Sequence, residues 1–230
     1  MSDLGSDADR RWLDAMWPFV RGHLPPTGGL VLDIGCGPLG GFVPALRADG
    51  YDAKGVDPEA PEGPQYHRVE FEQYTSEHKA AAIVASTSLH HVADLDAVVD
   101  LIAAELDPGG VLVVIEWARE RFDEATALWC FDRLSTSEGG WLHRHRDDWL
   151  ASGQPWPDYL RGWAEAEHMH TGQDILAGLG ARFDTQLVLE GPYFFPDLEG
   201  VTAVGEQAAI DAGQIQANGI SYIGHHIACS

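Results

Sequence analysis

The sequence has 230 residues, of which 45% are apolar and 22% charged, so it is long and apolar enough for one folded domain over residues 1–230. Acidic residues outnumber basic ones by 36 to 14, which gives a formal net charge of −22. Such a charge repels nucleic acid phosphates and anionic lipids, and it favours solubility or a cationic ligand. We expect a small-molecule partner, and neither a nucleic acid nor a membrane partner.

The three cysteines, Cys36, Cys130 and Cys229, are widely spaced and form no CxxC pair. This pattern is typical of a reducing compartment and argues against a disulfide framework or a zinc knuckle. The polar, acidic first residues differ from a secretory signal, and no apolar run is long enough to span a membrane. We therefore expect a cytoplasmic protein, either a monomer or a homodimer.

The chain begins with an expected helix over residues 7–23, within an N-terminal region that extends to residue 28. Strands and helices then alternate, which predicts an α/β fold with a parallel sheet and right-handed crossovers. Strands are expected over residues 30–34, 53–56, 66–71, 80–85, 111–115, 181–189 and 219–228. Helices are expected over residues 40–49, 95–106, 172–179 and 203–212.

Residues 118–170 interrupt this alternation and hold five of the eight tryptophans. The five are Trp129, Trp141, Trp149, Trp156 and Trp163. We expect this segment to form a small helical cap, inserted after the fifth strand. Its tryptophans either fill the core of the cap or line a pocket for a flat or apolar ligand.

A glycine-rich loop follows the first strand, where Gly35, Gly37 and Gly40 form the pattern G-x-G-x-x-G. Glycines let a backbone turn tightly and approach a ligand at a helix N-terminus, but nicotinamide and flavin domains share this pattern. Asp33 lies inside the apolar strand, where a carboxylate is costly without a partner. The ammonium group of a cationic amino acid would be such a partner, whereas backbone amides are the alternative. Asp57 ends the second strand, where a carboxylate accepts hydrogen bonds from ribose hydroxyls.

Five segments, in this order, resemble the motifs of the class I S-adenosylmethionine (SAM)-dependent methyltransferases. They are Val31-Leu-Asp-Ile-Gly-Cys-Gly37, Val56-Asp57, Val69-Glu-Phe-Glu72, Ala85-Ser-Thr-Ser-Leu-His-His-Val92 and Leu106-Asp-Pro-Gly-Gly-Val-Leu-Val-Val114. The resemblance covers roughly residues 29–116. Glu116-Trp117 and Trp163-Ala-Glu-Ala-Glu-His-Met-His170 also look like segments of small actinobacterial members of that family.

The resemblance implies a Rossmann-like sheet of seven strands, mostly parallel with an antiparallel last strand and with helices on both faces. It also implies SAM as the cofactor, with S-adenosylhomocysteine as its product. The residues implied to bind the cofactor are Asp33, Gly35, Cys36, Gly37, Asp57, Pro58, Glu70, Phe71, Glu72 and Ser86. The methionine end would lie against Asp33 and the glycines, the ribose against Asp57 and the adenine against Phe71. The acidic residue that meets the adenine amine is either Glu70 or Glu72, and Cys36 also fits as a small apolar filler.

The sequence indicates the residues that would bind the methyl acceptor less clearly. Histidines are the candidate general bases there, because they titrate near neutral pH. His91 follows the fourth strand, at the sheet edge where ligands bind, and His168 lies in the expected cap. Either one could instead be an ordinary surface or hydrogen-bonded histidine. Further candidate substrate residues are Trp117, His90, Trp129, Trp163 and His170. Two HxH pairs, at residues 143/145 and 168/170, lack an accompanying cysteine or carboxylate pattern, so we expect no metal.

The resulting hypothesis is methyl transfer from SAM to an oxygen or nitrogen atom of a small, aromatic or apolar metabolite. One alternative is a methyltransferase-like protein that binds SAM but catalyses a non-methyl reaction, such as cyclisation, or that only binds. The other is an NAD(P)-dependent oxidoreductase with the same glycine loop. Asp33 and the Pro-Gly-Gly segment at residues 108–110 argue against the oxidoreductase.

Overall fold

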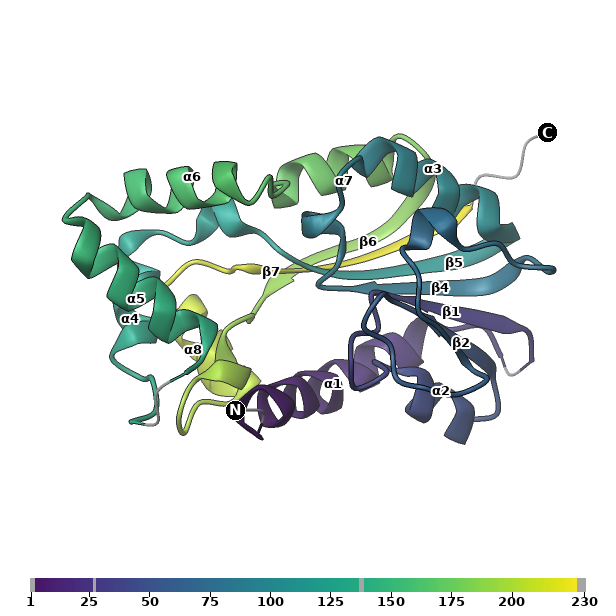
Figure 1. Ribbon diagram of the computed structural model, residues 1–230, viewed down its shortest axis with the longest axis horizontal. Helices are drawn as coiled ribbons and strands as arrows, with labels where there is room; N and C mark the ends of the chain where they lie inside the picture. Colours follow the sequence, from purple (N-terminus) through teal and green to yellow (C-terminus); the bar gives the residue numbers. More distant parts are fainter. Residues whose placement is uncertain (1–2, 27, 137–138, 227–230) are drawn as a thin grey trace.

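The computed structural model of the protein describes residues 3–26, 28–136 and 139–226. Its centre is a seven-stranded sheet with the order β3-β2-β1-β4-β5-β7-β6 (Figure 1). The strands are β1 (Leu30–Ile34), β2 (Asp52–Val56), β3 (Tyr66–His67), β4 (Ala80–Ser86), β5 (Leu106–Trp117), β6 (Phe183–Gly191) and β7 (Gly219–His226). Neighbouring strands from β3 to β5 are parallel, and β7 is antiparallel to both β5 and β6. The predicted Rossmann-like α/β fold is therefore confirmed.

Helices cover both faces of the sheet (Figure 1). On one face lie α3 (Leu95–Glu105) and α7 (Gly172–Gly180), and on the other lie α1 (Asp3–His23) and α2 (Val43–Ala48). Alternate residues of a strand point to opposite faces, so Leu32 joins the first core and Val31 the second. This two-sided burial explains why β1 and β4 are continuous apolar runs.

Within the described residues, two strands differ from their predicted lengths by more than one residue. The third was expected over residues 66–71, but β3 ends at His67 and a 3-10 turn follows at Phe71–Gln73. The reason is that its partner, β2, ends at Val56 opposite His67, so the remaining residues have no strand to pair with. The fifth was expected to begin at residue 111, but β5 begins at Leu106, which pairs with Ala80 across an irregularity in the ladder.

In its described residues, the segment between β5 and α7 forms three α-helices, which are α4 (Glu124–Phe131), α5 (Trp141–Ser152) and α6 (Trp156–Ala166). They lie at one end of the molecule, away from α2 and β2 (Figure 1). Their shared core is largely aromatic and is centred on Trp156, which is 0% exposed. Aromatic side chains at this density allow a small cap to bury a large apolar area.

The first helix is tied to a distant loop. The Arg11 guanidinium of α1 donates hydrogen bonds to the carbonyl oxygens of Phe195, Pro196, Leu198 and Val201, just before α8 (Ala203–Asp211). This anchor holds α1 against the loop that follows β6. Among the helices in the described ranges, none has the length and apolar character needed to cross a bilayer.

Candidate active site

A cavity of about 140 Å³ lies beside the glycine loop, where β1 and β4 end and α1 passes over them. We call it the glycine-loop cavity. The candidate cofactor residues that line it are Asp33, Gly35, Cys36, Gly37 and Ser86. Trp12, Leu13 and Thr87, which the sequence did not single out as cofactor residues, line it as well.

Glycine is required at two positions of this loop. A Cβ atom on Gly35 would lie 2.3 Å from the Cβ atom of Ser88, and one on Gly41 would lie 2.2 Å from Oδ2 of Asp33. Both residues also have positive φ angles, of 73° and 54°. The loop therefore passes Asp33 and Ser88 at a distance that no side chain allows.

Asp33 is 1% exposed, and its Oδ2 atom accepts a hydrogen bond of 2.6 Å from the Phe42 backbone N–H. Burial raises the pKa of Asp33 to about 7; the Phe42 N–H opposes this shift, and the nearby Asp57 adds to it. No ion pair to Asp33 is found within residues 3–26, 28–136 and 139–226. A buried carboxyl at a cavity wall, short of a cationic partner, fits a ligand that carries an ammonium group.

Asp57 lies at the end of β2, where it holds the glycine loop. Its carboxylate accepts hydrogen bonds from Gly37 N–H at 3.0 Å and from Glu59 N–H at 2.6 Å. It does not line the glycine-loop cavity, nor do the remaining four candidates for the ribose and adenine. Those four are Pro58, Glu70 and Glu72, which are exposed, and Phe71, which is buried. Phe71 stacks with Tyr74 at a ring distance of 6.3 Å.

A second cavity, of about 510 Å³, lies between the end of β5 and the cap. We call it the aromatic cavity. Its aromatic lining is Trp117, Trp141, Tyr159, Trp163 and Tyr193, with His90, His91 and His145 beside them. Trp117 stacks on Tyr193 with ring centroids 5.6 Å apart and an angle of 7° between the planes. Of the candidate acceptor residues, the structure thus brings together Trp117, Trp163, His90 and His91.

Three other candidates lie outside the aromatic cavity. His168 is exposed, with a φ angle of 53°. Trp129 lines a separate hollow beside α8, where the Arg133 guanidinium lies 4.3 Å from its ring centroid. The His170 ring is 2.9 Å from the Val92 carbonyl oxygen, and its backbone N–H donates to the carbonyl of His90. His170 therefore contacts the loop that carries His90 without lining the cavity itself.

Two histidines of the aromatic cavity are held in the neutral form. Burial lowers the pKa of His91 to about 4, and the neighbouring His90 adds to the shift. Burial likewise lowers the pKa of His145 to about 4; its Nδ1 atom is 3.0 Å from the Tyr159 hydroxyl. At neutral pH these imidazoles can exchange hydrogen bonds without bringing charge into the cavity.

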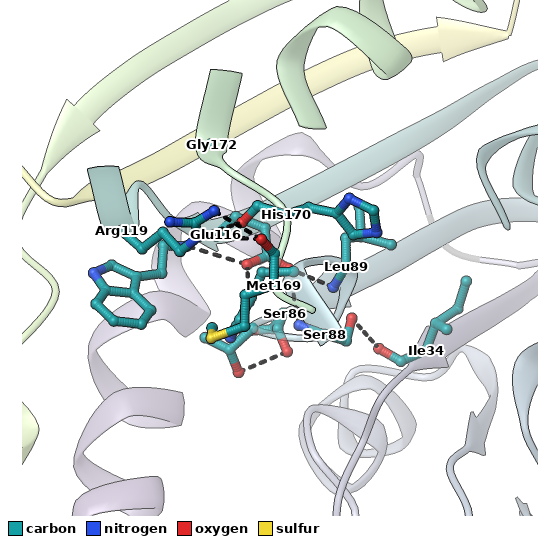
Figure 2. Close-up of polar contacts among 12 residues, drawn as sticks. Ile34, Ser86, Ser88, Leu89, Glu116, Arg119, Met169, His170 and Gly172 are labelled. Atoms are coloured by element: carbon teal, nitrogen blue, oxygen red, sulfur yellow. Dashed lines mark hydrogen bonds and ion pairs between the residues drawn. The ribbon is translucent and has the colours of Figure 1, made fainter. Parts of the chain in front are cut away.

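Sequence reasoning assigned no role to Glu116, which is 0% exposed at the end of β5. Its Oε1 atom accepts hydrogen bonds from the N–H groups of Ser88 and Leu89, at 2.8 and 2.6 Å (Figure 2). Its Oε2 atom lies 2.6 Å from Nδ1 of His90 and accepts the Trp117 N–H. Burial alone would raise the pKa of Glu116, but His90 and the backbone donors outweigh it and lower that pKa. The available signal was similar to that for Asp33, a carboxylate directly after the apolar run of residues 111–115.

Thr87 joins these cavities. It lines the glycine-loop cavity, the aromatic cavity and a third cavity of about 750 Å³ between α1 and the cap. Its φ angle of 53° is unusual for a residue with a branched side chain. Such strain persists only where the surroundings enforce it, and it concentrates at functional sites.

The two histidines of the first HxH pair, at residues 143 and 145, have different hydrogen-bond partners. His143 Nε2 lies 3.0 Å from the Ser135 carbonyl oxygen, whereas His145 contacts Tyr159. In the part of the chain that the structure describes, no cluster of three or more histidine, cysteine or acidic side chains could hold a metal ion.

Known structures share this architecture. The fold is similar to that of an S-adenosylmethionine dependent methyltransferase from Mesorhizobium loti, with a TM-score of 0.55 and 19% identity over 93% of this chain and 100% of that one. It is similar to the N-methyltransferase NodS from Bradyrhizobium japonicum WM9, with a TM-score of 0.50, 12% identity and coverage of 96% and 86%. It is also similar to the geranyl diphosphate C-methyltransferase from Streptomyces coelicolor A3(2), with a TM-score of 0.54, 15% identity and coverage of 93% and 76%. At these identities the likeness shows the fold alone.

The sequence itself adds the family. No curated protein matches it. The family model described as a methyltransferase domain matches residues 6–174, which is more than half of the chain and includes both the glycine loop and the cap. The chain therefore belongs to the methyltransferase-domain family and is an enzyme of that family.

Proposed function

We propose that this enzyme transfers the methyl group of SAM to an oxygen or nitrogen atom of a small, aromatic or apolar acceptor. The observation that carries this proposal is the junction at Thr87, which lines both the glycine-loop cavity and the aromatic cavity. Methyl transfer is an in-line displacement, so most of the catalytic effect comes from holding the two reactants together. Two cavities that share a wall suit this requirement.

The glycine-loop cavity would take the methionine end of SAM. The Asp33 carboxyl would face its ammonium group, the backbone of Gly35 to Gly37 would lie against its carboxylate, and Ser86 would lie near the methyl group. Asp57 with Pro58 would contact the ribose. The adenine would pack on Phe71, with Glu70 or Glu72 at its amine. Support for these outer contacts is limited to the resemblance of the motifs and the place of Asp57 beside Gly37.

The aromatic cavity would take the acceptor. Flat and apolar ligands bind well against aromatic faces, and Trp117, Trp163 and Tyr193 provide them. His91 would contact the acceptor as a neutral imidazole. The exposure of His168, outside this cavity, gives no support to a catalytic role for it, and Trp129 and His170 would act only through neighbouring residues.

Calorimetry with SAM and with NAD tests the cofactor half. We expect SAM to bind and NAD not to bind, because Asp33 would repel a pyrophosphate. Asp33→Ala should abolish SAM binding, whereas Asp7→Ala, an exposed position on α1, serves as the matched control. Failure of the full-length chain to bind SAM at high micromolar concentrations would contradict the proposal.

A labelled-methyl assay tests the acceptor half. The enzyme is incubated with methyl-labelled SAM and a small-molecule extract, and label and S-adenosylhomocysteine are both measured. We expect labelled products of low molecular weight that partition into organic solvent. SAM binding without any formation of S-adenosylhomocysteine would favour a non-methyl reaction or a binding protein instead.

We also infer a cytoplasmic setting and a small-molecule partner without nucleic acid or membrane. The support is the acidic composition and the two described cysteines, Cys36 and Cys130, which are both free and buried. The resemblance of residues 116–117 and 163–170 to actinobacterial members supports a subgroup of that type.

A further inference from the structure

The hydrogen bond between Glu116 and His90 fixes which ring nitrogen of His90 faces the carboxylate. Nδ1 of His90 lies 2.6 Å from Oε2 of Glu116, and the two side chains are only 5% and 0% exposed. Because the carboxylate can only accept, Nδ1 carries the proton. In the neutral imidazole, Nε2 then carries a free lone pair.

The Nε2 atom is left available to a ligand. Across the described ranges, no hydrogen bond to Nε2 of His90 is found, although this ring lines the aromatic cavity. The ring lies against two other rings, those of His91 and Trp117, with centroid distances of 4.1 and 6.1 Å. Aromatic neighbours constrain the ring without occupying its nitrogen.

The backbone around His90 is held from both sides. Glu116 accepts the N–H groups of Ser88 and Leu89, and the His90 carbonyl accepts the His170 N–H at 3.1 Å. His170 is held in turn, because the Arg119 guanidinium donates to the carbonyls of Met169 and His170 (Figure 2). An imidazole with one nitrogen on a buried carboxylate, on a backbone held by these hydrogen bonds, is preorganised to take a proton at the other nitrogen.

We propose that His90, oriented by Glu116, is the general base of this enzyme, and that the acceptor is a hydroxyl compound of phenol type. This inference rests on the proposed function. His91 shares the cavity but has no carboxylate within hydrogen-bond distance among the described residues. Glu116 is a positioning residue, because it acts through His90.

The reaction balances as follows. The acceptor oxygen forms a bond to the methyl carbon while the carbon–sulfur bond breaks and leaves its electron pair on sulfur. The hydroxyl proton passes to Nε2 of His90, and Glu116 stabilises the resulting imidazolium before the proton returns to solvent. A neutral hydroxyl is a weak nucleophile and needs this proton transfer, whereas a neutral amine attacks through its own lone pair.

The kinetic test uses methyl-labelled SAM with a panel of phenols and the anilines that carry the same ring substituents. We expect label in the phenols. His90→Gln should lower kcat by about 100-fold or more with little change in KM. Glu116→Gln should also lower kcat, and free imidazole should restore turnover to His90→Gly. His78→Gln, at an exposed position in another loop, is the matched control and should keep full activity.

The results that overturn the assignment are equally clear. They are methylation of anilines at a rate that His90→Gln does not change, or a loss of turnover in His91→Gln that imidazole rescues while His90→Gln stays active. In both results methyl transfer from SAM still takes place, so they reject only the role of His90 as the general base. Absence of SAM binding in calorimetry would instead reject the proposed function.

A second measurement needs neither turnover nor a variant. In the full-length chain with ¹⁵N-labelled histidine, at a pH where the His90 ring is neutral, the proton should lie on Nδ1 and not on Nε2. Adding 4-nitrophenol with S-adenosylhomocysteine should shift the Nε2 resonance. A neutral His90 ring with its proton on Nε2, or no response to 4-nitrophenol, would overturn the proposal even if no member of the panel is methylated.

Discussion

The indole N–H of Trp12 donates a hydrogen bond of 3.0 Å to the hydroxyl oxygen of Ser86, and both residues line the glycine-loop cavity. Trp12 belongs to α1 and Ser86 ends β4, so the contact joins the N-terminal helix to the carboxyl edge of the sheet. Trp12 also contacts the rings of Tyr193 and Phe195, at 5.3 and 6.0 Å. The first helix is therefore a wall of the glycine-loop cavity.

Replacing Trp12 should weaken SAM binding. Trp12→Phe keeps an aromatic ring but removes the hydrogen bond to Ser86, which should lower the free energy of unfolding by about 1 kcal/mol. SAM affinity should fall as well, because the Ser86 side chain loses its fixed position. Calorimetry and urea unfolding check both effects. Phe19→Leu, on the same helix but away from the cavity, should leave SAM affinity unchanged. Equal SAM affinities for wild type and Trp12→Phe would refute this role.

Gly41 should not tolerate even a methyl group. In Gly41→Ala the new Cβ atom would meet Oδ2 of Asp33 at 2.2 Å, at a backbone φ of 54°. We expect displacement of Asp33 and a fall in SAM affinity of at least about tenfold, since 1.4 kcal/mol of lost interaction has that effect. Gly22→Ala is the control, because its new Cβ atom would meet no other atom within 4 Å. Gly22 lies in α1, where alanine is more stable than glycine by about 1 kcal/mol, so this variant should fold normally. Isothermal titration with SAM measures the affinity of both variants. A Gly41→Ala variant with wild-type SAM affinity would contradict the predicted displacement of Asp33.

SAM binding should release protons below neutral pH. In the free protein the pKa of Asp33 lies at about 7, raised by burial from an ordinary value of 3.8. The native state therefore binds this proton more tightly than the unfolded state does. The contribution of this proton to the free energy of unfolding is fully present below pH 3.8 and is lost as the pH rises through about 7. A bound ammonium group would favour the ionised carboxylate, so SAM affinity should rise with pH up to about 7.

Calorimetry in two buffers of different ionisation heat measures this proton release. The comparison is with Asp33→Asn, whose amide can still accept the Phe42 N–H but does not titrate. The pH-dependent difference in unfolding free energy between the two proteins isolates the contribution of Asp33. Identical heats in both buffers at pH 6, for wild type, would show that Asp33 does not change its protonation when SAM binds.

Glu206 should be essential for the shape of the aromatic cavity. It is 0% exposed and accepts hydrogen bonds from the backbone N–H groups of Tyr193, Phe194 and Phe195. Glu206→Ala leaves these donors without a partner, which should cost about 3 kcal/mol or more. Val204→Ala, at an 80% exposed position of the same helix, should change stability by less than about 0.5 kcal/mol. Urea unfolding gives both values, and a loss below about 1 kcal/mol for Glu206→Ala would show that water replaces the carboxylate.

The fold could be predicted because its signals are local. The apolar runs at β1, β4 and β5 and the glycine loop each reflect residues close in sequence, and their order implies the sheet. The predicted strand bounds were wrong where pairing with a neighbouring strand determines where a strand begins or ends. Residues 68–70 would suit a strand, but β2 has already ended beside His67. The sequence around Pro108 predicts a stop, yet it lies inside β5 because Leu106 pairs with Ala80.

The sequence singled out part of the lining of each cavity. Asp33 and Gly35 were identified because a carboxylate is costly inside an apolar strand and a glycine lets the backbone approach a ligand closely. Trp12 was assigned to a helix and no more, since periodicity shows that a residue is buried but not what it contacts. Glu116 was missed because its partners, Ser88, Leu89 and His90, lie at least 26 residues away in the sequence. His168 was favoured by its place in the cap, and only the three-dimensional structure shows that it lies outside the aromatic cavity.

The Arg11 anchor has a consequence for how the molecule opens. One guanidinium satisfies four carbonyl oxygens of the loop after β6, and the same loop carries Phe195, which stacks on Trp12. The N-terminal helix and the loop after β6 are thereby joined into one cooperative unit, in the sense used for sub-global unfolding. Amide hydrogens of α1 and of residues 193–198 should exchange with solvent together, and an event that frees the N-terminus would expose the methyl donor and the acceptor to water at the same moment.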